Sequence, residues 1–289
     1  MKKVIVRIKG GLGNQLFCYA AARRLALVNK AELVIDNVTG FVRDRQYRRQ
    51  YALDRFHIPV RKATPAERME PLERYRRGLA KLIACHRPFP QRHYVEQEGN
   101  DFNARLLNFK VNGTVYLDGY WQDEKYFKDV EQTIRRDFQI TPPNDLTNRN
   151  MAEHIRRCNA IAVHVRWFDL PGTRNPQHNT PASYYGRAVA EMEQRVSNPH
   201  FFLFSDDPVS ARRLLGLPEE RVTCIDHNHG DENAYADLWL MTTCKHLIIA
   251  NSSFSWWGAW LSASPDRTVI APISGFDSTG TIPSAWMLI

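Results

Sequence analysis

Hydrophobic positions along the chain fall into short runs separated by turns and by segments with helical spacing. The first run, residues 4–8, is rich in β-branched side chains and predicts a strand. The glycine-rich residues 10–13 predict a tight turn, residues 17–29 a helix whose alanines allow close packing, and residues 32–36 a second strand. A strand, a glycine turn, a helix and a strand in this order are typical of a parallel α/β layer.

The segment that follows is less regular. Residues 39–97 are rich in arginine and poorly periodic, and they predict only short helices. Two prolines within residues 141–144 interrupt any helix, so we expect a linker there and a domain boundary after residue 143. The elements predicted in this part are a short helix near residues 71–84, a strand at 115–120 and a helix at 123–138.

A second α/β pattern fills the rest of the chain. Its strongest strand, residues 160–165, is a continuous apolar run, as in a parallel sheet buried on both faces. The pattern thus predicts an α/β protein of two doubly wound domains, 1–143 and 144–289, which face each other across a cleft and bind a ligand at the carboxyl ends of their strands. The further predicted elements are helices at 183–196, 209–215, 234–243 and 254–261, and strands at 201–204, 221–225, 246–250 and 268–271.

Composition adds constraints on class and compartment. Hydrophobic residues make up 43% of the chain and charged residues 24%, which predicts a folded globular protein. The five cysteines include no C-x-x-C pair, so we expect a reducing compartment, without a disulfide framework or a zinc site. The apolar run at the N-terminus contains Arg7 and is too short for a signal peptide, and no run approaches the roughly 18 residues of a membrane span. We therefore expect a cytoplasmic protein.

The net charge of +8 comes mostly from arginines, many of them within residues 43–77. A basic surface suits an anionic partner, although a solvated basic helix is the simpler interpretation. The charge keeps open a non-enzymatic module that binds nucleic acid or glycan. Such a module would bind polyanions with a steep salt dependence and would turn over no substrate.

The glycine turn also carries candidate chemistry. It partly matches a dinucleotide-binding loop, because Asp36 stands at the expected acidic position, but Leu16 replaces the third glycine, so a nicotinamide or flavin enzyme remains only an alternative. Gly11 and Gly13 let backbone N–H groups approach a ligand. The amides of Asn14 and Gln15 can hold sugar hydroxyls or phosphate oxygens, although Asn14 can equally cap the helix.

Polar side chains cluster where the strands of the second half end. His164 and Arg166 share one face of the strongest strand, and the planar fork of arginine suits a pyrophosphate. Asp206 follows the next strand and is free to accept hydrogen bonds if Asp207 caps the short helix behind it. Residues 252–254 open a later helix and form either an anion site or a plain serine cap, while the three tryptophans beyond them favour packing.

Six segments together resemble glycosyltransferase family 11, the α-1,2-fucosyltransferases, and they occur in that family's order. The wider fucosyltransferase group is similar in the glycine loop and in the His-x-Arg strand. The segments are GGLGNQLFCYAAARRLA at 10–26, GYWQDEKYF at 119–127, HVRWFD at 164–169, SYYGRAV at 183–189, FFLFSDDP at 201–208 and DLWLMTTCKHLIIANSSFSWWGAWL at 237–261.

The resemblance implies a GT-B type fold, with domain 1–143 on the acceptor side and domain 144–289 binding GDP-fucose. It implies inverting transfer of L-fucose to the 2-hydroxyl of a terminal galactose. GDP-fucose is then a co-substrate, and neither a cofactor nor a metal is expected, in agreement with the lack of an Asp-x-Asp motif. The expected acceptor is a galactose-terminated oligosaccharide or a lipid-linked glycan, not a nucleic acid, and the basic face leaves a peripheral membrane contact open.

The resemblance also implies roles for single residues. We expect His164 and Asp206 to contact the guanosine, Arg166 the pyrophosphate, Ser253 a phosphate and Asn14 the reacting centre. Catalysis would rest on Asn14 and Arg166, with Asp169 either orienting Arg166 or acting as a base. The remaining residues expected at the donor are Gly11, Gly13, Gln15, Ser252 and Phe254.

One position departs from the family pattern. The family usually shows a second arginine directly after the first, and Trp167 stands there instead. Either another arginine compensates, or the leaving group is less well stabilised, at a cost of roughly 3 kcal/mol at the transition state. Trp167 can instead stack on a sugar face and shift the acceptor preference.

Overall fold

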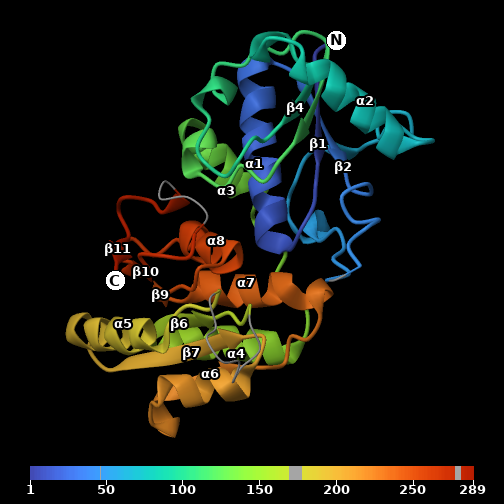
Figure 1. Cartoon of the computed structure of the whole chain (residues 1–289). Coiled ribbons are helices and arrows are strands. Elements are labelled where there is room, and N and C mark those ends of the chain that lie inside the picture. The colour runs from blue at the N-terminus through green and yellow to red at the C-terminus, as the bar shows by residue number, and fades with distance from the viewer. Residues whose placement is uncertain (46, 169–177, 277–280) are drawn as a thin grey trace. The chain divides into compact units, whose positions relative to one another are not determined.

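The computed structural model describes residues 1–45, 47–168, 178–276 and 281–289. Contacts within the chain divide it into two compact units, Met1–Gln139 and Ile140–Ile289, which we call unit 1 and unit 2 (Figure 1). The division falls just before the two prolines that suggested a boundary after residue 143. Both units are layers of helices on a parallel sheet, so the predicted α/β class is confirmed.

Unit 1 is built on a five-stranded sheet in which every neighbouring pair runs parallel. The strand order is β3-β2-β1-β5-β4, so the order reverses between β1 and β5. The elements are β1 (Lys3–Arg7), α1 (Leu12–Asn29), β2 (Glu32–Asp36), β3 (Arg61–Lys62), α2 (Glu73–Cys85), β4 (Tyr94–Glu96), β5 (Thr114–Asp118) and α3 (Glu131–Asp137), with 3₁₀ turns at Leu53–Arg55, Phe89–Gln91, Ala104–Leu106, Glu124–Tyr126 and Lys128–Val130.

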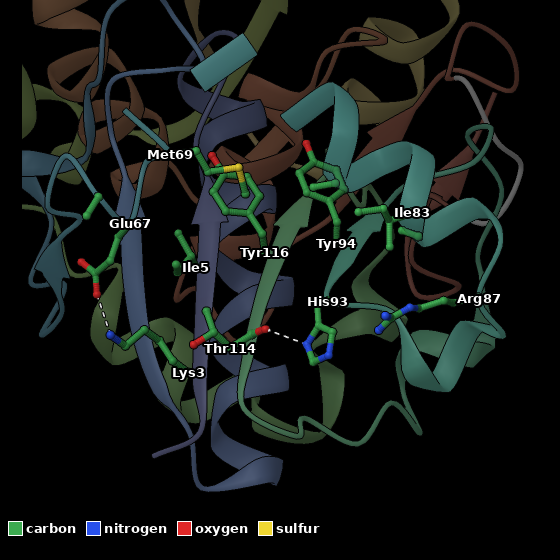
Figure 2. A pocket seen from close by; sticks show the side chains of 13 residues that line it. Lys3, Ile5, Glu67, Met69, Ile83, Arg87, His93, Tyr94, Thr114 and Tyr116 are labelled. Carbon is green, nitrogen blue, oxygen red and sulfur yellow. Dashed lines mark hydrogen bonds and ion pairs between the residues drawn. The ribbon is translucent and has the colours of Figure 1, made fainter. Parts of the chain in front are cut away.

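Helices cover both faces of the unit 1 sheet, with α1 and α2 on opposite sides (Figures 1 and 2). Ile5 of β1 packs with Val34 and Tyr116 on the face that α2 covers through Ala84. The neighbouring valines of β1 point to the other face, where α1 lies. The three alanines at 20–22 are fully buried, which confirms the close packing predicted for this helix.

Unit 2 is built on a six-stranded parallel sheet of order β11-β10-β9-β6-β7-β8. The chain starts in the middle at β6, adds β7 and β8 on one side, and then crosses to β9 on the other. The elements are α4 (Leu146–Arg157), β6 (Asn159–Val165), α5 (Ala182–Arg195), β7 (Pro199–Ser205), α6 (Pro208–Leu215), β8 (Val222–Ile225), α7 (Ala234–Thr243), β9 (His246–Ile248), α8 (Ser253–Leu261), β10 (Val269–Ala271) and β11 (Met287–Leu288), with 3₁₀ turns at Glu219–Arg221 and Asp231–Asn233.

The tryptophans of α8 belong to the core of unit 2. Trp256 and Trp257 are fully buried, with their ring centroids 4.9 Å apart, and Trp260 stacks nearly parallel to Trp256. The Trp256 indole N–H donates to the Thr281 carbonyl at 2.9 Å. The packing interpretation of the three tryptophans is therefore confirmed.

The helices differ from the prediction at three places, two in their boundaries and one in a helix that was missed. The first helix begins at Leu12 rather than at residue 17, so the second half of the glycine loop is its first turn. The helix predicted over 123–138 is wrong in its first half, where two 3₁₀ turns precede α3. Helix α4 follows the linker and was not predicted.

Candidate active site

The polar groups predicted in the second half lie at the reversal point of the unit 2 sheet. In doubly wound sheets, ligands bind outside the carboxyl ends of the strands at the point where the strand order reverses. That point here is between β6 and β9, which pair in parallel through Val163 and Ile248. His164 and Arg166 stand at the end of β6, and Ser252 and Ser253 follow β9.

The His164 side chain is almost completely buried beside the first turn of α8. Its ring centroid lies 5.6 Å from that of Phe254, and its Nδ1 atom is buried without a hydrogen-bond partner. Burial, with a smaller contribution from the positive charge of Arg166, lowers the pKa of His164 to about 3. A neutral imidazole with an unused polar atom at a strand end is suited to a hydrogen bond with a ligand.

Arg166 is held in place by Asp206, at the end of the neighbouring strand. Because β6 and β7 run parallel with Val165 opposite Ser205, the residues that follow are brought side by side. The Arg166 guanidinium forms an ion pair with Asp206 at 2.9 Å, and the other carboxylate oxygen accepts the Trp167 backbone N–H at 3.1 Å. Asp207 accepts the Ser210 N–H at 3.0 Å and caps α6, as the sequence suggested.

The N-terminus of α8 is the third part of this candidate site, after His164 and the Arg166–Asp206 pair. Ser252 is the N-cap, and its hydroxyl accepts the Phe254 N–H at 3.3 Å. The first turn contains no acidic residue, so the positive end of the helix dipole is not neutralised from within the helix. The plain capping interpretation of Ser252 is thus correct for its side chain, while the other N–H groups of the first turn have no acceptor inside the helix.

Two tyrosines of α5 form hydrogen bonds to backbone carbonyls at the ends of the strands. The Tyr185 hydroxyl donates to the His164 carbonyl at 3.1 Å. The Tyr184 hydroxyl donates to the Ile249 carbonyl at 2.7 Å and lies 3.0 Å from that of Ile270. Both tyrosines are buried, so the backbone around His164 is rigidly positioned.

Trp167 points towards the protein interior. It packs against the buried cluster that contains Tyr184 and Tyr185, and its indole N–H is buried without a hydrogen-bond partner. This packing favours a structural role over stacking on a sugar. Asp169, the acidic residue expected in the same block, lies outside the described residues.

A polar network that joins α4 and α7 of unit 2 was missed by sequence reasoning. The Asn228 amide donates to Asp237 of α7 at 2.9 Å and exchanges hydrogen bonds with Asn148 of α4 at 2.8 and 3.0 Å. Burial raises the pKa of Asp237 to about 7, although the Asn228 bond opposes the shift. Asp237 opens the long C-terminal segment 237–261, and its place on an otherwise apolar helix was the available signal.

In unit 1, the glycine loop turns tightly into α1. Gly10 has a φ of +76°, and an added Cβ would lie 3.0 Å from the Asn14 amide nitrogen, so a side chain at this position is strained. The N-cap is Gly11, and Asn14 lies inside the helix, where its Oδ1 accepts from the Gln122 amide at 2.7 Å. Asn14 therefore does not cap α1. Gly13 is buried within the first turn.

The buried side chain of Gln15 links this loop to a neighbouring segment through hydrogen bonds to the backbone. Its amide nitrogen donates to the carbonyls of Gly10 at 2.9 Å and Gln50 at 2.8 Å, and its oxygen accepts the Ala52 N–H at 2.9 Å. Both of its N–H groups are therefore used by the backbone. In this structure Gln15 supports the loop from inside.

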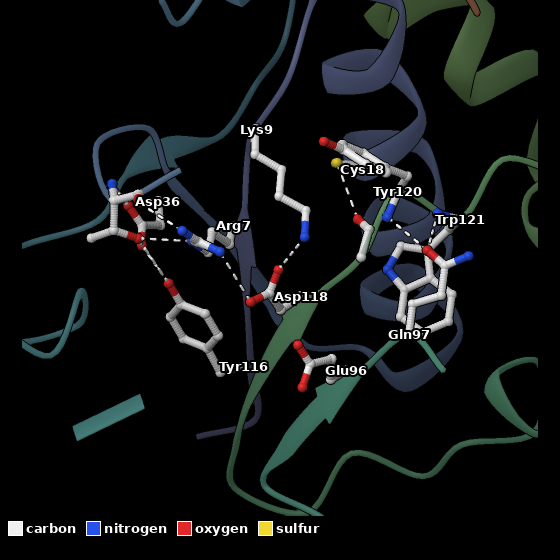
Figure 3. A network of polar contacts seen from close by, with 12 residues as sticks. Arg7, Lys9, Cys18, Asp36, Glu96, Gln97, Tyr116, Asp118, Tyr120 and Trp121 are labelled. Carbon is white, nitrogen blue, oxygen red and sulfur yellow. Dashed lines mark hydrogen bonds and ion pairs between the residues drawn. The ribbon is translucent and has the colours of Figure 1, made fainter. Parts of the chain in front are cut away.

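The carboxyl ends of β1 and β5 carry a charged network (Figure 3). Asp118 accepts from Arg7 at 3.2 Å and from Lys9 at 2.7 Å. Burial alone would raise the pKa of Asp118, but these two cations lower it to about 2. Asp36 accepts from the Thr39 hydroxyl at 2.5 Å and from the Tyr116 hydroxyl. Since Asp36 is fully buried in these bonds, it is not available for a ribose, which weighs against a dinucleotide enzyme.

Residues 1–45, 47–168, 178–276 and 281–289 contain no group of three or more His, Cys, Asp or Glu side chains arranged to hold a metal. Within the same ranges, no helix is both long and apolar enough to cross a bilayer. All five cysteines are described and none forms a disulfide.

Comparison with known proteins supports the predicted family. A family model described as glycosyl transferase family 11 matches residues 3–281. An α-1,2-colitosyltransferase of Escherichia coli is 29% identical over 302 aligned positions, which cover 100% of this chain and 99% of that protein. The galactoside 2-α-L-fucosyltransferase Sec1 of Mus musculus is 23% identical over 94% of this chain and 71% of its own length.

Solved structures support the fold. The fucosyltransferase NodZ from Bradyrhizobium aligns with a TM-score of 0.55 at 17% identity, over 89% of this chain and 92% of its own. A crystal of NodZ soaked with GDP-fucose aligns with a TM-score of 0.54 at 18% identity, over 90% and 92%. Together with the two parallel sheets, this likeness confirms a fold of the GT-B type with two Rossmann-like units.

Proposed function

The chain belongs to glycosyl transferase family 11, and on that premise we propose that it transfers L-fucose from GDP-fucose to the 2-hydroxyl of a terminal galactose, with inversion at the anomeric carbon. The names of two relatives, an α-1,2-colitosyltransferase and a galactoside 2-α-L-fucosyltransferase, support a 6-deoxy sugar and this linkage. NodZ has been soaked with GDP-fucose, which supports the donor.

The observation that carries the proposal is the constellation at the reversal point of unit 2. His164 offers a buried polar atom without a partner, Arg166 a positioned guanidinium, and α8 a helix N-terminus without acidic residues. An imidazole suits a nucleoside, and a cation beside a helix N-terminus suits a diphosphate. We therefore assign the GDP moiety to His164, Arg166, Asp206, Ser252, Ser253 and Phe254, with Asp206 acting chiefly through Arg166.

The proposed chemistry breaks the bond between the anomeric carbon and the β-phosphate oxygen. The acceptor 2-oxygen forms its bond from the opposite face, and GDP leaves with the electron pair. Arg166 and the N–H groups of α8 stabilise the charge that develops on the leaving diphosphate. The acceptor proton passes to the leaving phosphate or to a base, for which Asp169 is the candidate within the His-x-Arg block.

In unit 1 we assign Asn14 to the reacting centre, because its amide is oriented by Gln122 at the start of α1. Gly11 and Gly13 belong to the same turn and present backbone N–H groups, while Gln15 holds the loop. We propose that no cofactor or divalent metal takes part, since Arg166 and the α8 N-terminus supply the positive charge that a metal would otherwise provide.

The acceptor we propose is a galactose-terminated oligosaccharide or lipid-linked glycan, by analogy with the galactoside named for the mouse relative. Five free cysteines support a reducing compartment such as the cytoplasm. A second candidate donor is a GDP-linked colitose, because the bacterial relative that aligns over the whole chain is a colitosyltransferase. Competition between the two donors for one acceptor, followed by mass spectrometry of the product, distinguishes them.

Calorimetric titration with GDP tests the donor site. We expect Arg166→Ala to weaken GDP binding at least about tenfold, because a charge-assisted contact to the diphosphate is lost. Arg187→Ala is the matched control, since Arg187 is an exposed arginine of α5, and it should bind GDP as the wild type does. Equal affinities of both variants would overturn the assignment of Arg166.

A further inference from the structure

Helix α2 of unit 1 carries apolar side chains that no described part of the chain covers. Leu72, directly before the helix, is 63% exposed, and within the helix Tyr75 is 73%, Leu79 59% and Leu82 57% exposed. These spacings of three and four residues place all four side chains on one face. We call this set, Leu72, Tyr75, Leu79 and Leu82, the α2 stripe.

The α2 stripe points away from the sheet. With about 100° of rotation per residue, positions 77, 80 and 84 fall on the opposite face of the helix. Arg77 and Ala84 are the buried residues of α2, and Ala80 and Ala84 line a cavity of about 560 Å³ between the helix and the sheet (Figure 2). The helix thus faces this cavity through Ala80, Ile83 and Ala84, whereas the side chains of the α2 stripe do not line it.

Basic residues border the α2 stripe on both sides. By the same helical geometry, Arg76 lies along one edge and Arg74 on the other side, with Lys81 closer to the buried face. Arg87 is exposed and follows the helix, directly after the C-cap His86. The helix contains a single acidic residue, Glu73. Lys81 forms an exposed ion pair with Glu96, and no ion pair to Arg74, Arg76 or Arg87 is found among the described residues.

We propose that α2 is a membrane-surface helix that places its apolar stripe in the interface of an anionic bilayer, with the flanking arginines on lipid phosphates. A helix with an apolar face, cationic edges and low overall hydrophobicity lies in the plane of a bilayer rather than across it. The lack of a spanning helix in the described part of the chain agrees with this mode.

A second copy of the chain is a poorer occupant for the same face. Two α2 helices packed stripe to stripe would bring the cationic edges of both copies together, with only Glu73 of each to offset them. Like charges at such an edge oppose association. An anionic lipid surface offers the opposite charge along both edges.

Vesicle flotation with the whole protein tests the proposal. We expect the protein to bind vesicles of phosphatidylcholine that contain about 30% phosphatidylglycerol, because the anionic surface attracts the basic edges. Binding should weaken at high salt and should be at least about tenfold weaker to vesicles of pure phosphatidylcholine. Leu79→Glu/Leu82→Glu should lose at least about tenfold in affinity, since it puts charge into the buried stripe.

The control is Leu146→Glu/Val209→Glu, which adds the same charge at two exposed apolar positions of unit 2 and should bind as the wild type does. Arg74→Gln/Arg76→Gln tests the cationic edges alone and should flatten the salt dependence. Equal thermal unfolding of all variants shows that each is folded. Absence of wild-type binding to anionic vesicles overturns the proposal. Undiminished binding of the Leu79→Glu/Leu82→Glu variant also overturns it, and so does a wild-type dimer that this variant abolishes without any vesicle binding.

Discussion

Two titratable side chains of unit 2, His164 and Asp237, respond to pH in opposite ways. His164 has a pKa of about 3 in the folded protein, so it stays neutral where an unfolded chain would already be protonated. Asp237 has a pKa of about 7, so it stays protonated where an unfolded chain would already be charged. Each group therefore changes the stability of unit 2 over its own pH window.

For His164, stability should be lost as pH falls from about 6.5 towards about 3, because only the unfolded state takes up the proton there. Between about pH 6.5 and pH 5 the loss amounts to roughly 2 kcal/mol. His164→Asn should remove this dependence. Urea unfolding of both proteins at the two pH values measures it, and an unchanged difference between them would contradict a neutral His164.

For Asp237 the pH dependence of the stability has the opposite sign. The folded state holds a proton that the unfolded state releases above about pH 4, so stability should fall as pH rises to about 7. Asp237→Asn keeps the hydrogen bond to Asn228 possible, and its stability relative to the wild type should rise by roughly 2 kcal/mol between pH 5 and pH 7. Thermal melts of both proteins at pH 5 and pH 7 test this, and parallel shifts in both would rule it out.

The ion pair of Arg166 with Asp206 predicts a non-additive pair of mutations. Arg166→Ala should lower transfer at least about a hundredfold, because the leaving diphosphate loses its cation. Asp206→Ala should lower it less, because the guanidinium remains but is no longer oriented. If Asp206 acts through Arg166, the double variant is no slower than Arg166→Ala. Additive losses in kcat would give Asp206 a contact of its own with the donor.

At the scale of elements, the start of α8 serves both the stability of the helix and, in our proposal, donor binding. Ser252→Ala removes the cap and should cost about 1 kcal/mol of unfolding free energy. Ser252→Asp keeps a capping oxygen and the stability, but it places a negative charge where we assign a phosphate, so GDP affinity should fall at least about tenfold. Unfolding curves and GDP titrations of both variants separate the two effects. Unimpaired GDP binding by Ser252→Asp would remove α8 from the donor site.

Element predictions from the sequence succeeded where one pattern dominated. The strand at 160–165 and the helix at 183–196 agree closely with β6 and α5, because long apolar or amphipathic periodicity decides them. The first helix begins earlier than predicted because its N-cap is Gly11, which has no capping side chain that could be recognised in the sequence. The helix at 123–138 is interrupted because the backbone of Phe127, with φ −144° and ψ 8°, leaves the helical region between two 3₁₀ turns.

Site residues followed the same division. The sequence could place His164, Arg166 and Ser252 at one edge of the unit 2 sheet because each lies at or just after the end of an apolar strand, and parallel strands end on one edge of a sheet. The pairing of Asp206 with Arg166 and the Asn148–Asn228–Asp237 network could not be predicted, because they depend on which strands and helices become neighbours. Which strands and helices lie side by side is decided by the tertiary fold and is not encoded in any local sequence pattern.

For the whole molecule, the two units share one organising rule. Each is a parallel sheet whose strand order reverses once, between β1 and β5 in unit 1 and between β6 and β9 in unit 2. In both, charged side chains gather at the carboxyl ends of the strands at the reversal, as with Asp118 and Arg166. In unit 1 these charges neutralise one another, whereas unit 2 keeps a buried His164 nitrogen without a partner. We therefore assign donor recognition chiefly to unit 2.

Release of GDP from GDP-fucose in the presence of EDTA, with and without lactose or another terminal-galactose glycan, tests the proposed reaction most directly. We predict that release depends on the acceptor, continues in EDTA, and yields fucose linked α-1,2 to galactose. Release that requires a divalent cation would contradict the role given to Arg166 and α8. Tight GDP binding without acceptor-dependent release for any galactoside would contradict the proposed transfer to galactose.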